Sequence, residues 1–156
     1  IELIESDRII NRETKKGNEF IIGEFRTFSN PIAHDENHLV LVNPSNAGNL
    51  GTIIRSMQAF ELNNLAIIKP SVDIFNTKTI RSSMGAVFQT NFEFFSSFEE
   101  YSNKFAKHSK YFFILEGQKK LDELKGIAQV PYSLVFGNES TGLPQNVVEV
   151  ENTGML

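Results

Sequence analysis

The chain contains no cysteine, which excludes disulfide bonds and thiolate metal sites. Its three histidines, His34, His38 and His108, do not have the spacing of metal ligands, so no metal site is expected. No apolar run approaches the length of a membrane span, and the first residues lack the basic start and long apolar core of a signal peptide. We therefore expect no membrane insertion, and the cytoplasm is the default location.

An excess of positive charge is also lacking. The net charge is −4, so the composition does not favour binding of nucleic acid by bulk electrostatics, and any such binding would need a local basic patch. The best candidate patch consists of Lys104, Lys107, His108, Lys110, Lys119, Lys120 and Lys125. We favour the simpler interpretation of this set as a solvated face.

What is present is the composition of an ordinary globular domain. The 156 residues are 40% hydrophobic and 22% charged, enough for one domain with a buried core. Strands are predicted at 38–42, 65–68, 87–92, 111–115 and 132–136, with a weaker one at 20–28. Helical patterns fall at 49–61, from Asn76 to Gly85, from Ser97 to Phe105 and, briefly, at 121–125.

Strands that alternate with helices predict an α/β fold, with a mostly parallel sheet covered by helices on both faces. Within it, the right-handed crossover rule makes the strands at 38–42 and 65–68 parallel. Residues 1–37 are treated as an N-terminal extension, and residues 38–156 as the main domain.

Two glycine-bearing loops follow buried strands, one over 43–51 and one over 137–144. In the first, the helix that leaves the loop has an apolar stripe, and Arg55 falls nearly opposite it, on a face shared with Gly48 and Gly51. We expect both loops at the carboxyl ends of the strands, where open α/β sheets bind ligands.

The polar residues of these loops each have a structural and a functional interpretation. Asn46 is a good helix cap, and Arg55 alone reads as a solvated helix residue or as a bidentate phosphate ligand. Glu139 is a candidate acid or base, but we favour a role in accepting backbone N–H groups to fix a loop. Neither a phosphate-binding P-loop, a dinucleotide fingerprint nor a serine elbow is present, which disfavours nucleotide hydrolysis and serine hydrolysis.

The first loop and helix, Asn43-Pro44-x-Asn46-x-Gly48-Asn49-x-Gly51-Thr52-Ile53-Ile54-Arg55, resemble the first motif of the SpoU (TrmH) family of RNA ribose 2′-O-methyltransferases. The segment Leu134-Val135-Phe136-Gly137-Asn138-Glu139-x-x-Gly142-Leu143 resembles the second motif, and Arg81–Ala86 resembles the segment between them. The resemblance covers about residues 38–150, in the order and after the strands that the family requires.

This resemblance implies a Rossmann-like α/β fold with a C-terminal trefoil knot, S-adenosylmethionine as methyl donor, tRNA or rRNA as acceptor, and a homodimer. By match, Asn46, Arg55 and Glu139 are the catalytic-motif positions, with Glu139 organising the loop. The cofactor-binding positions that it implies are Leu115, Glu116, Gly117, Gly137, Asn138 and Gly142.

The family's third motif, a Ser-x-Asn-type segment that enters a final helix, is not found before Leu156. Because that motif normally supplies part of the cofactor pocket, we expect these 156 residues alone to bind S-adenosylmethionine weakly. Three functions remain open: a 2′-O-methyltransferase, a non-catalytic RNA- or cofactor-binding module of the same fold, and an unrelated α/β nucleotide-binding enzyme. The motif pattern disfavours the third.

Overall fold

A computed structural model of the chain describes residues 23–114 and 131–149. Its centre is a sheet of five parallel strands in the order β3-β2-β1-β5-β4. The strands are β1 (His38–Val42), β2 (Asn64–Ile68), β3 (Asn91–Phe95), β4 (Ser109–Phe113) and β5 (Tyr132–Phe136). The predicted α/β class is confirmed, as is the parallel pairing of β1 with β2.

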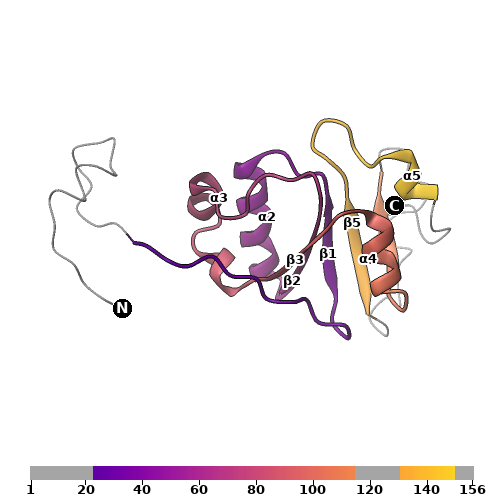
Figure 1. Cartoon of the computed structure of the whole chain (residues 1–156), viewed down its shortest axis with the longest axis horizontal. Coiled ribbons are helices and arrows are strands. Elements are labelled where there is room, and N and C mark those ends of the chain that lie inside the picture. Colours follow the sequence, from indigo (N-terminus) through magenta and orange to yellow (C-terminus); the bar gives the residue numbers. More distant parts are fainter. Residues whose placement is uncertain (1–22, 115–130, 150–156) are drawn as a thin grey trace, which may run out of the picture.

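Helices cover the two faces of the sheet in two groups, as Figure 1 shows. On one face lie α2 (Ala47–Ala59), α3 (Thr77–Ser82) and the 3₁₀ helix η1 (Ala86–Gln89). On the other lie α4 (Phe98–Lys104) and α5 (Gln145–Glu149). None of the helices in the described ranges is long and apolar enough to cross a membrane.

Alternate residues of the central strands form two apolar cores, one on each face, as the two-residue period of a strand requires. Leu39 and Leu41 of β1 face α2, where the helix buries Leu50 and Ile54 completely. Val40 of β1 faces α4 and joins a cluster of rings on that side. That cluster includes Phe95, Phe98, Tyr101, Phe105 and Phe112, all with less than 5% of their surface exposed. Most phenylalanines of the described residues therefore belong to one of the two cores or pack against one.

Polar side chains cap the N-termini of the helices, at the residues that the sequence predicted for α3 and α4. Asn76 caps α3 by accepting the N–H of Lys78 at 2.9 Å, and Ser97 Oγ accepts the N–H of Glu100 at 3.1 Å at the start of α4. The helix predicted at 49–61 begins two residues earlier, at Ala47, because Asn46 is its cap.

Two predicted strands are wrong. Residues 23–28 form no strand: Phe25 and Phe28 instead pack their rings against Phe75 and Phe88. The strand predicted at 87–92 is a 3₁₀ turn followed by β3, because the left-handed Gly85 (φ 87°) starts the turn and buried Val87 joins the core. The strand predicted at 111–115 is β4, shifted two residues toward the N-terminus.

Residues 30–37 pack closely on the domain that begins at β1. Ile32 is 3% exposed, and the backbone N–H of Ala33 donates to Asn64 Oδ1 at 3.0 Å. The helical pattern predicted at 121–125 lies outside the described residues. The predicted trefoil knot involves C-terminal segments of which only 131–149 are described, and it stays a prediction.

Candidate functional site

The loops after β1 and β5 meet at the carboxyl edge of the sheet. The chain runs outward from β1 to β2 on one side, whereas β5 pairs with β1 on the other, so the strand order changes direction between them. Such a switch point is where open α/β sheets bind their ligands. Asn43, with φ 53°, turns the first loop off the sheet, and its carbonyl accepts the side-chain amide of Asn138 at 2.7 Å.

Glu139 joins the second loop to the first. Its carboxylate accepts the backbone N–H and the hydroxyl of Ser45 at 3.3 and 3.0 Å, and the backbone N–H of Asn46 at 3.3 Å. Partial burial alone would raise the pKa of Glu139, but these hydrogen bonds outweigh it and lower the pKa below its usual range. The carboxylate therefore bonds the backbone N–H groups of a loop, as the sequence analysis favoured.

Asn138 gives the second loop its internal structure. Its Oδ1 accepts the backbone N–H groups of Ser140 and Thr141, and its backbone pairs in both directions with that of Gly142. Gly142 lies at φ 69°, a left-handed conformation that a side chain disfavours. The result is a tight turn that presents Glu139 to the first loop.

Asn46 is the N-cap of α2. Its Oδ1 accepts the N–H groups of Gly48 and Asn49 at 2.9 and 3.2 Å, so the structural role weighed from the sequence is present. The same residue is tied to Glu139 through its own backbone N–H. Asn46 and Glu139 are thus brought together, although 93 residues separate them.

Arg55 lies two turns further along α2 with its side chain exposed, opposite the buried face formed by Leu50, Ile54 and Met57. Among residues 23–114 and 131–149, none forms an ion pair or side-chain hydrogen bond with its guanidinium. The structure therefore places Arg55 on the same helix as Asn46 but not in contact with Asn46 or Glu139.

The face of α2 that carries the glycines is covered at Gly51. A Cβ atom added to Gly51 would stand 2.0 Å from Ser82 Oγ and 2.4 Å from the Thr79 carbonyl oxygen, so α3 covers this position within the same chain. The absence of a side chain at Gly51 allows α2 and α3 to approach each other closely, so this position is not accessible to a second subunit.

Of the predicted cofactor positions, Leu115, Glu116 and Gly117 lie outside the described residues. Gly137 follows β5 directly, and a Cβ atom there would stand 2.1 Å from the Gly142 carbonyl carbon. Gly137, Asn138 and Gly142 are therefore brought together in one loop, whose amide groups mainly bond one another and the first loop.

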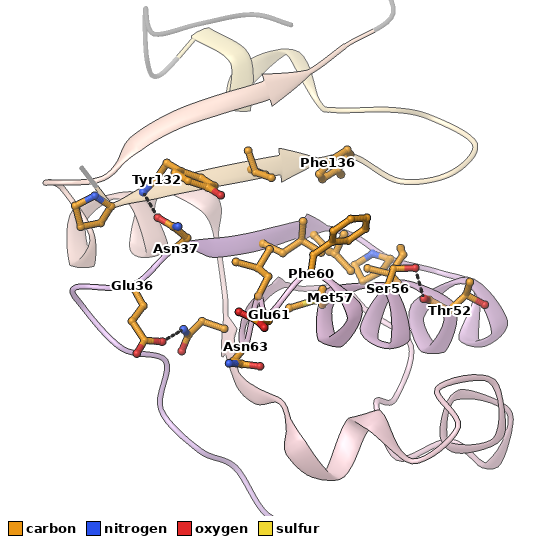
Figure 2. Close-up of a pocket in the computed structure, with 18 of the residues that line it drawn as sticks. Glu36, Asn37, Thr52, Ser56, Met57, Phe60, Glu61, Asn63, Tyr132 and Phe136 are labelled. Carbon is orange, nitrogen blue, oxygen red and sulfur yellow. Dashed lines mark hydrogen bonds between the residues drawn. The ribbon is translucent and has the colours of Figure 1, made fainter. Parts of the chain in front are cut away.

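A groove of about 1180 Å³ runs beside this loop, between β5 and α2. In Figure 2, Phe136 and Tyr132 of β5 line one side, and Met57 and Phe60 near the end of α2 line the other. The groove reaches the carboxyl edge at Pro44, Gly137 and Glu139. Its charged lining residues are all acidic, namely Asp35, Glu36, Glu61 and Glu139. This groove is suited to an apolar group and repels phosphate.

The predicted basic patch is not a continuous surface in its described part. Lys110 is 2% exposed, and His108 is buried with hydrogen bonds to Ser133 and to the His34 carbonyl. Lys104 pairs with Glu93. Lys107 is exposed, and the other three members, Lys119, Lys120 and Lys125, lie outside the described residues.

Two residues near the loops escaped the sequence analysis. Ser45 donates twice to Glu139, and Lys78 extends from α3 to the first turn of α2, where its Cε would stand 3.1 Å from a Cβ atom added to Gly48. A serine in a turn and a lysine at a helix start are too common to be recognised without their partners.

A parallel open sheet with two hydrogen-bonded loops at its switch point defines the chain as an α/β protein with a candidate ligand site at the carboxyl edge. The model of the SpoU rRNA Methylase family matches residues 36–153, and the chain belongs to this family.

Similar proteins share this assignment. A stretch of 58 residues is 33% identical to the 23S rRNA (uridine(2479)-2′-O)-methyltransferase of Streptomyces viridochromogenes and covers 37% of this chain and 20% of that protein. The AdoMet-bound rRNA methyltransferase from Sinorhizobium meliloti shares the fold with a TM-score of 0.82 and 23% identity, over 96% of this chain and 60% of its own. The SpoU methyltransferase AviRb from Streptomyces viridochromogenes has a TM-score of 0.68 and 23% identity, over 80% and 51% of the two chains. The chain thus spans only part of the length of these relatives.

Proposed function

We propose that the protein transfers a methyl group from S-adenosylmethionine to a ribose 2′-hydroxyl of a structured RNA, either tRNA or rRNA. Membership of the SpoU rRNA Methylase family carries this proposal, because the family match spans both loops of the site. A cytoplasmic location accords with such a substrate.

The described residues fit the proposed cofactor at the carboxyl edge. The groove offers an apolar wall from Leu134 and Phe136 beside Gly137, which suits a purine ring. By resemblance, Gly137, Asn138 and Gly142 would hold the cofactor together with Leu115, Glu116 and Gly117. The cofactor would supply an activated methyl group on its sulfonium and leave as the neutral thioether. The ribose hydroxyl has to be aligned with that methyl group and to lose its proton as the C–O bond forms.

In this proposal Arg55 acts on the RNA. Its guanidinium is exposed and always charged at neutral pH, so it can hold the phosphate that adjoins the target ribose and stabilise the developing alkoxide. Asn46 orients the ribose or the arginine through its amide nitrogen while its Oδ1 caps α2. Glu139 holds the first loop in place through Ser45 and Asn46.

The test is transfer of labelled methyl groups from S-adenosylmethionine to tRNA and rRNA by the complete natural protein. We expect the label at a single ribose, where the methyl group makes the adjoining phosphodiester bond resistant to alkali. We expect no incorporation of label with Arg55→Ala. Because Arg55 contacts no core residue, the variant should keep the wild-type melting temperature. RNA binding without any methyl transfer by the wild-type protein would favour the non-catalytic module instead.

We also propose that the protein is a homodimer, as the family resemblance implies. Since α3 covers Gly51, the subunit contact does not use that position. Light scattering at micromolar concentration should give twice the subunit mass, and a clean monomer would count against the proposal.

A further inference from the structure

Lys78 lies next to the first loop of the site although it belongs to another helix. It occupies the first turn of α3, where its backbone N–H is bonded to Asn76. A Cβ atom added to Gly48 would stand 3.1 Å from Lys78 Cε, 3.6 Å from Lys78 Nζ and 3.2 Å from Asn46 Oδ1. The lysine stem therefore lies over the side-chain-free surface of Gly48, and its ammonium group is brought to the residue that caps α2.

The close approach of the two helices makes this placement firm. At Gly51, one turn further along α2, there is no room even for a methyl group between α2 and α3. The start of α3 is thus held beside the start of α2, so the Lys78 side chain has only a short distance to span to reach Gly48.

The positive charge of Lys78 has no ion-pair partner in the part of the chain that the structure describes. The first turn of α2 contains no acidic residue, and within the described ranges no carboxylate forms an ion pair with Lys78. Glu139, the carboxylate of the second motif, is engaged by Ser45 and Asn46. An ammonium group held at this place is stabilised when an anion comes to it from outside.

Under the proposed function that anion is the RNA backbone. Gly48 and Arg55 are seven residues apart on α2, which corresponds to about 10 Å along the helix. Lys78 and Arg55 therefore offer two cations along one face, whereas the charged lining of the neighbouring groove is acidic. We propose that Lys78 binds a phosphate of the RNA substrate beside the target ribose, as a second cationic contact in addition to Arg55. This inference rests on the proposed function.

The experiment compares Lys78→Gln and Lys78→Arg with the wild-type complete protein. Lys78→Gln should raise the KM for RNA about tenfold, change kcat less than threefold and leave the affinity for S-adenosylmethionine unchanged. The slope of the logarithm of RNA affinity against the logarithm of salt concentration should fall by about 1, as expected for one lost phosphate contact. Lys78→Arg should restore most of the affinity.

Lys107→Gln is the matched control. Lys107 is exposed like Lys78 but precedes β4 at the amino end of the sheet, so the same change of charge there should leave the KM and the salt slope as in the wild type. The melting temperatures of all variants establish that each is folded.

The outcomes separate the inference from the proposed function. Methyl transfer with a wild-type KM and salt slope in Lys78→Gln would overturn the role of Lys78 and leave the proposed function standing. If the wild type binds RNA but transfers no methyl group, filter binding at a series of salt concentrations still tests the role of Lys78. A smaller salt slope in Lys78→Gln then supports the inference, and an unchanged slope overturns it. A protein that binds no RNA at all would overturn both.

Discussion

The carboxylate of Glu139 accepts the backbone N–H of Asn46 at 3.3 Å, so the loop after the last strand holds the residue that starts α2. The same carboxylate accepts two bonds from Ser45, and Asn138 beside it donates to the Asn43 carbonyl. Asn138 also donates to Ser45 Oγ at 3.1 Å, so five hydrogen bonds join the loops of two neighbouring strands and hold the loop that leads into α2, the helix that carries Arg55.

Replacement of Glu139 should lower methyl transfer without unfolding the protein. In Glu139→Gln, one of the two acceptor oxygens becomes an NH₂ group that faces N–H donors, so we expect a loss of kcat of about tenfold or more, nearly as large as in Glu139→Ala. The residue is exposed, so the free energy of unfolding should fall by only about 1 kcal/mol. Steady-state kinetics and chemical denaturation measure the two effects, and a fully active Glu139→Gln would show that the bridge is dispensable.

The two roles of Asn46 can be separated by substitution. Asn46→Ala removes the cap of α2 and should cost about 1 kcal/mol of stability. Asn46→Asp keeps an acceptor for the N–H groups of Gly48 and Asn49, so its stability should stay close to wild type. If the amide nitrogen of Asn46 serves the reaction, both variants lose turnover. Wild-type turnover in Asn46→Asp would reduce the residue to a helix cap.

Gly51 and Gly48 lie on one face of α2 but should respond differently to alanine. In Gly51→Ala the new methyl group meets the Thr79 carbonyl and Ser82, so the helices have to separate, and we expect a loss of about 2 kcal/mol or more. In Gly48→Ala the methyl group meets the flexible end of Lys78 and, at 3.2 Å, Asn46 Oδ1, contacts that need only small shifts and that helix propensity offsets. Urea denaturation of the two variants is the measurement, and equal stabilities would contradict the packing described at Gly51.

Much of the fold was predictable because its strands are continuous apolar runs bounded by turn residues. His38–Val42 and Tyr132–Phe136 have the predicted bounds, since both lie in the centre of the sheet and are covered by helices on one or both faces. The strand at 87–92 was wrongly predicted because Val87 and Phe88 have strand propensity. The left-handed Gly85 and the core contact of Val87 impose a turn there instead.

The site was predictable only to the level of its loops. The role of Glu139 as an acceptor of backbone N–H groups follows from its place in a glycine-bearing loop. Its partners lie 93 and 94 residues away, and no local pattern specifies them. For the same reason the sequence did not predict the burial of Lys110. The surrounding lysines suggest a solvated face, but Lys110 lies at the start of β4, in the interior of the protein.

His38 should make the stability of the protein depend on pH. Burial lowers the pKa of His38 to about 4, and the nearby positive charges of His108, His34 and Lys104 add to the lowering. The hydrogen bond that His38 donates to the Ala33 carbonyl acts in the opposite direction and raises the pKa. Its other ring nitrogen lies 2.9 Å from the Tyr101 hydroxyl, which completes the environment of a neutral ring. Burial lowers the pKa of His108 as well.

In the unfolded chain a histidine titrates near pH 6.5, so between about pH 6.5 and pH 4 the unfolded state binds a proton that folded His38 does not. The free energy of unfolding should therefore fall as the pH is lowered through this window, by about 1.4 kcal/mol per pH unit for each such histidine. Urea denaturation at a series of pH values measures the slope. His38→Gln should be less stable at pH 7 and should show a flatter dependence, because it removes one of the groups that bind protons only when unfolded. His34→Gln, which replaces an exposed histidine nearby and leaves His38 in place, is the control whose slope should stay closer to wild type than that of His38→Gln. If His38→Gln keeps that slope too, the buried histidine is not the source of the acid sensitivity.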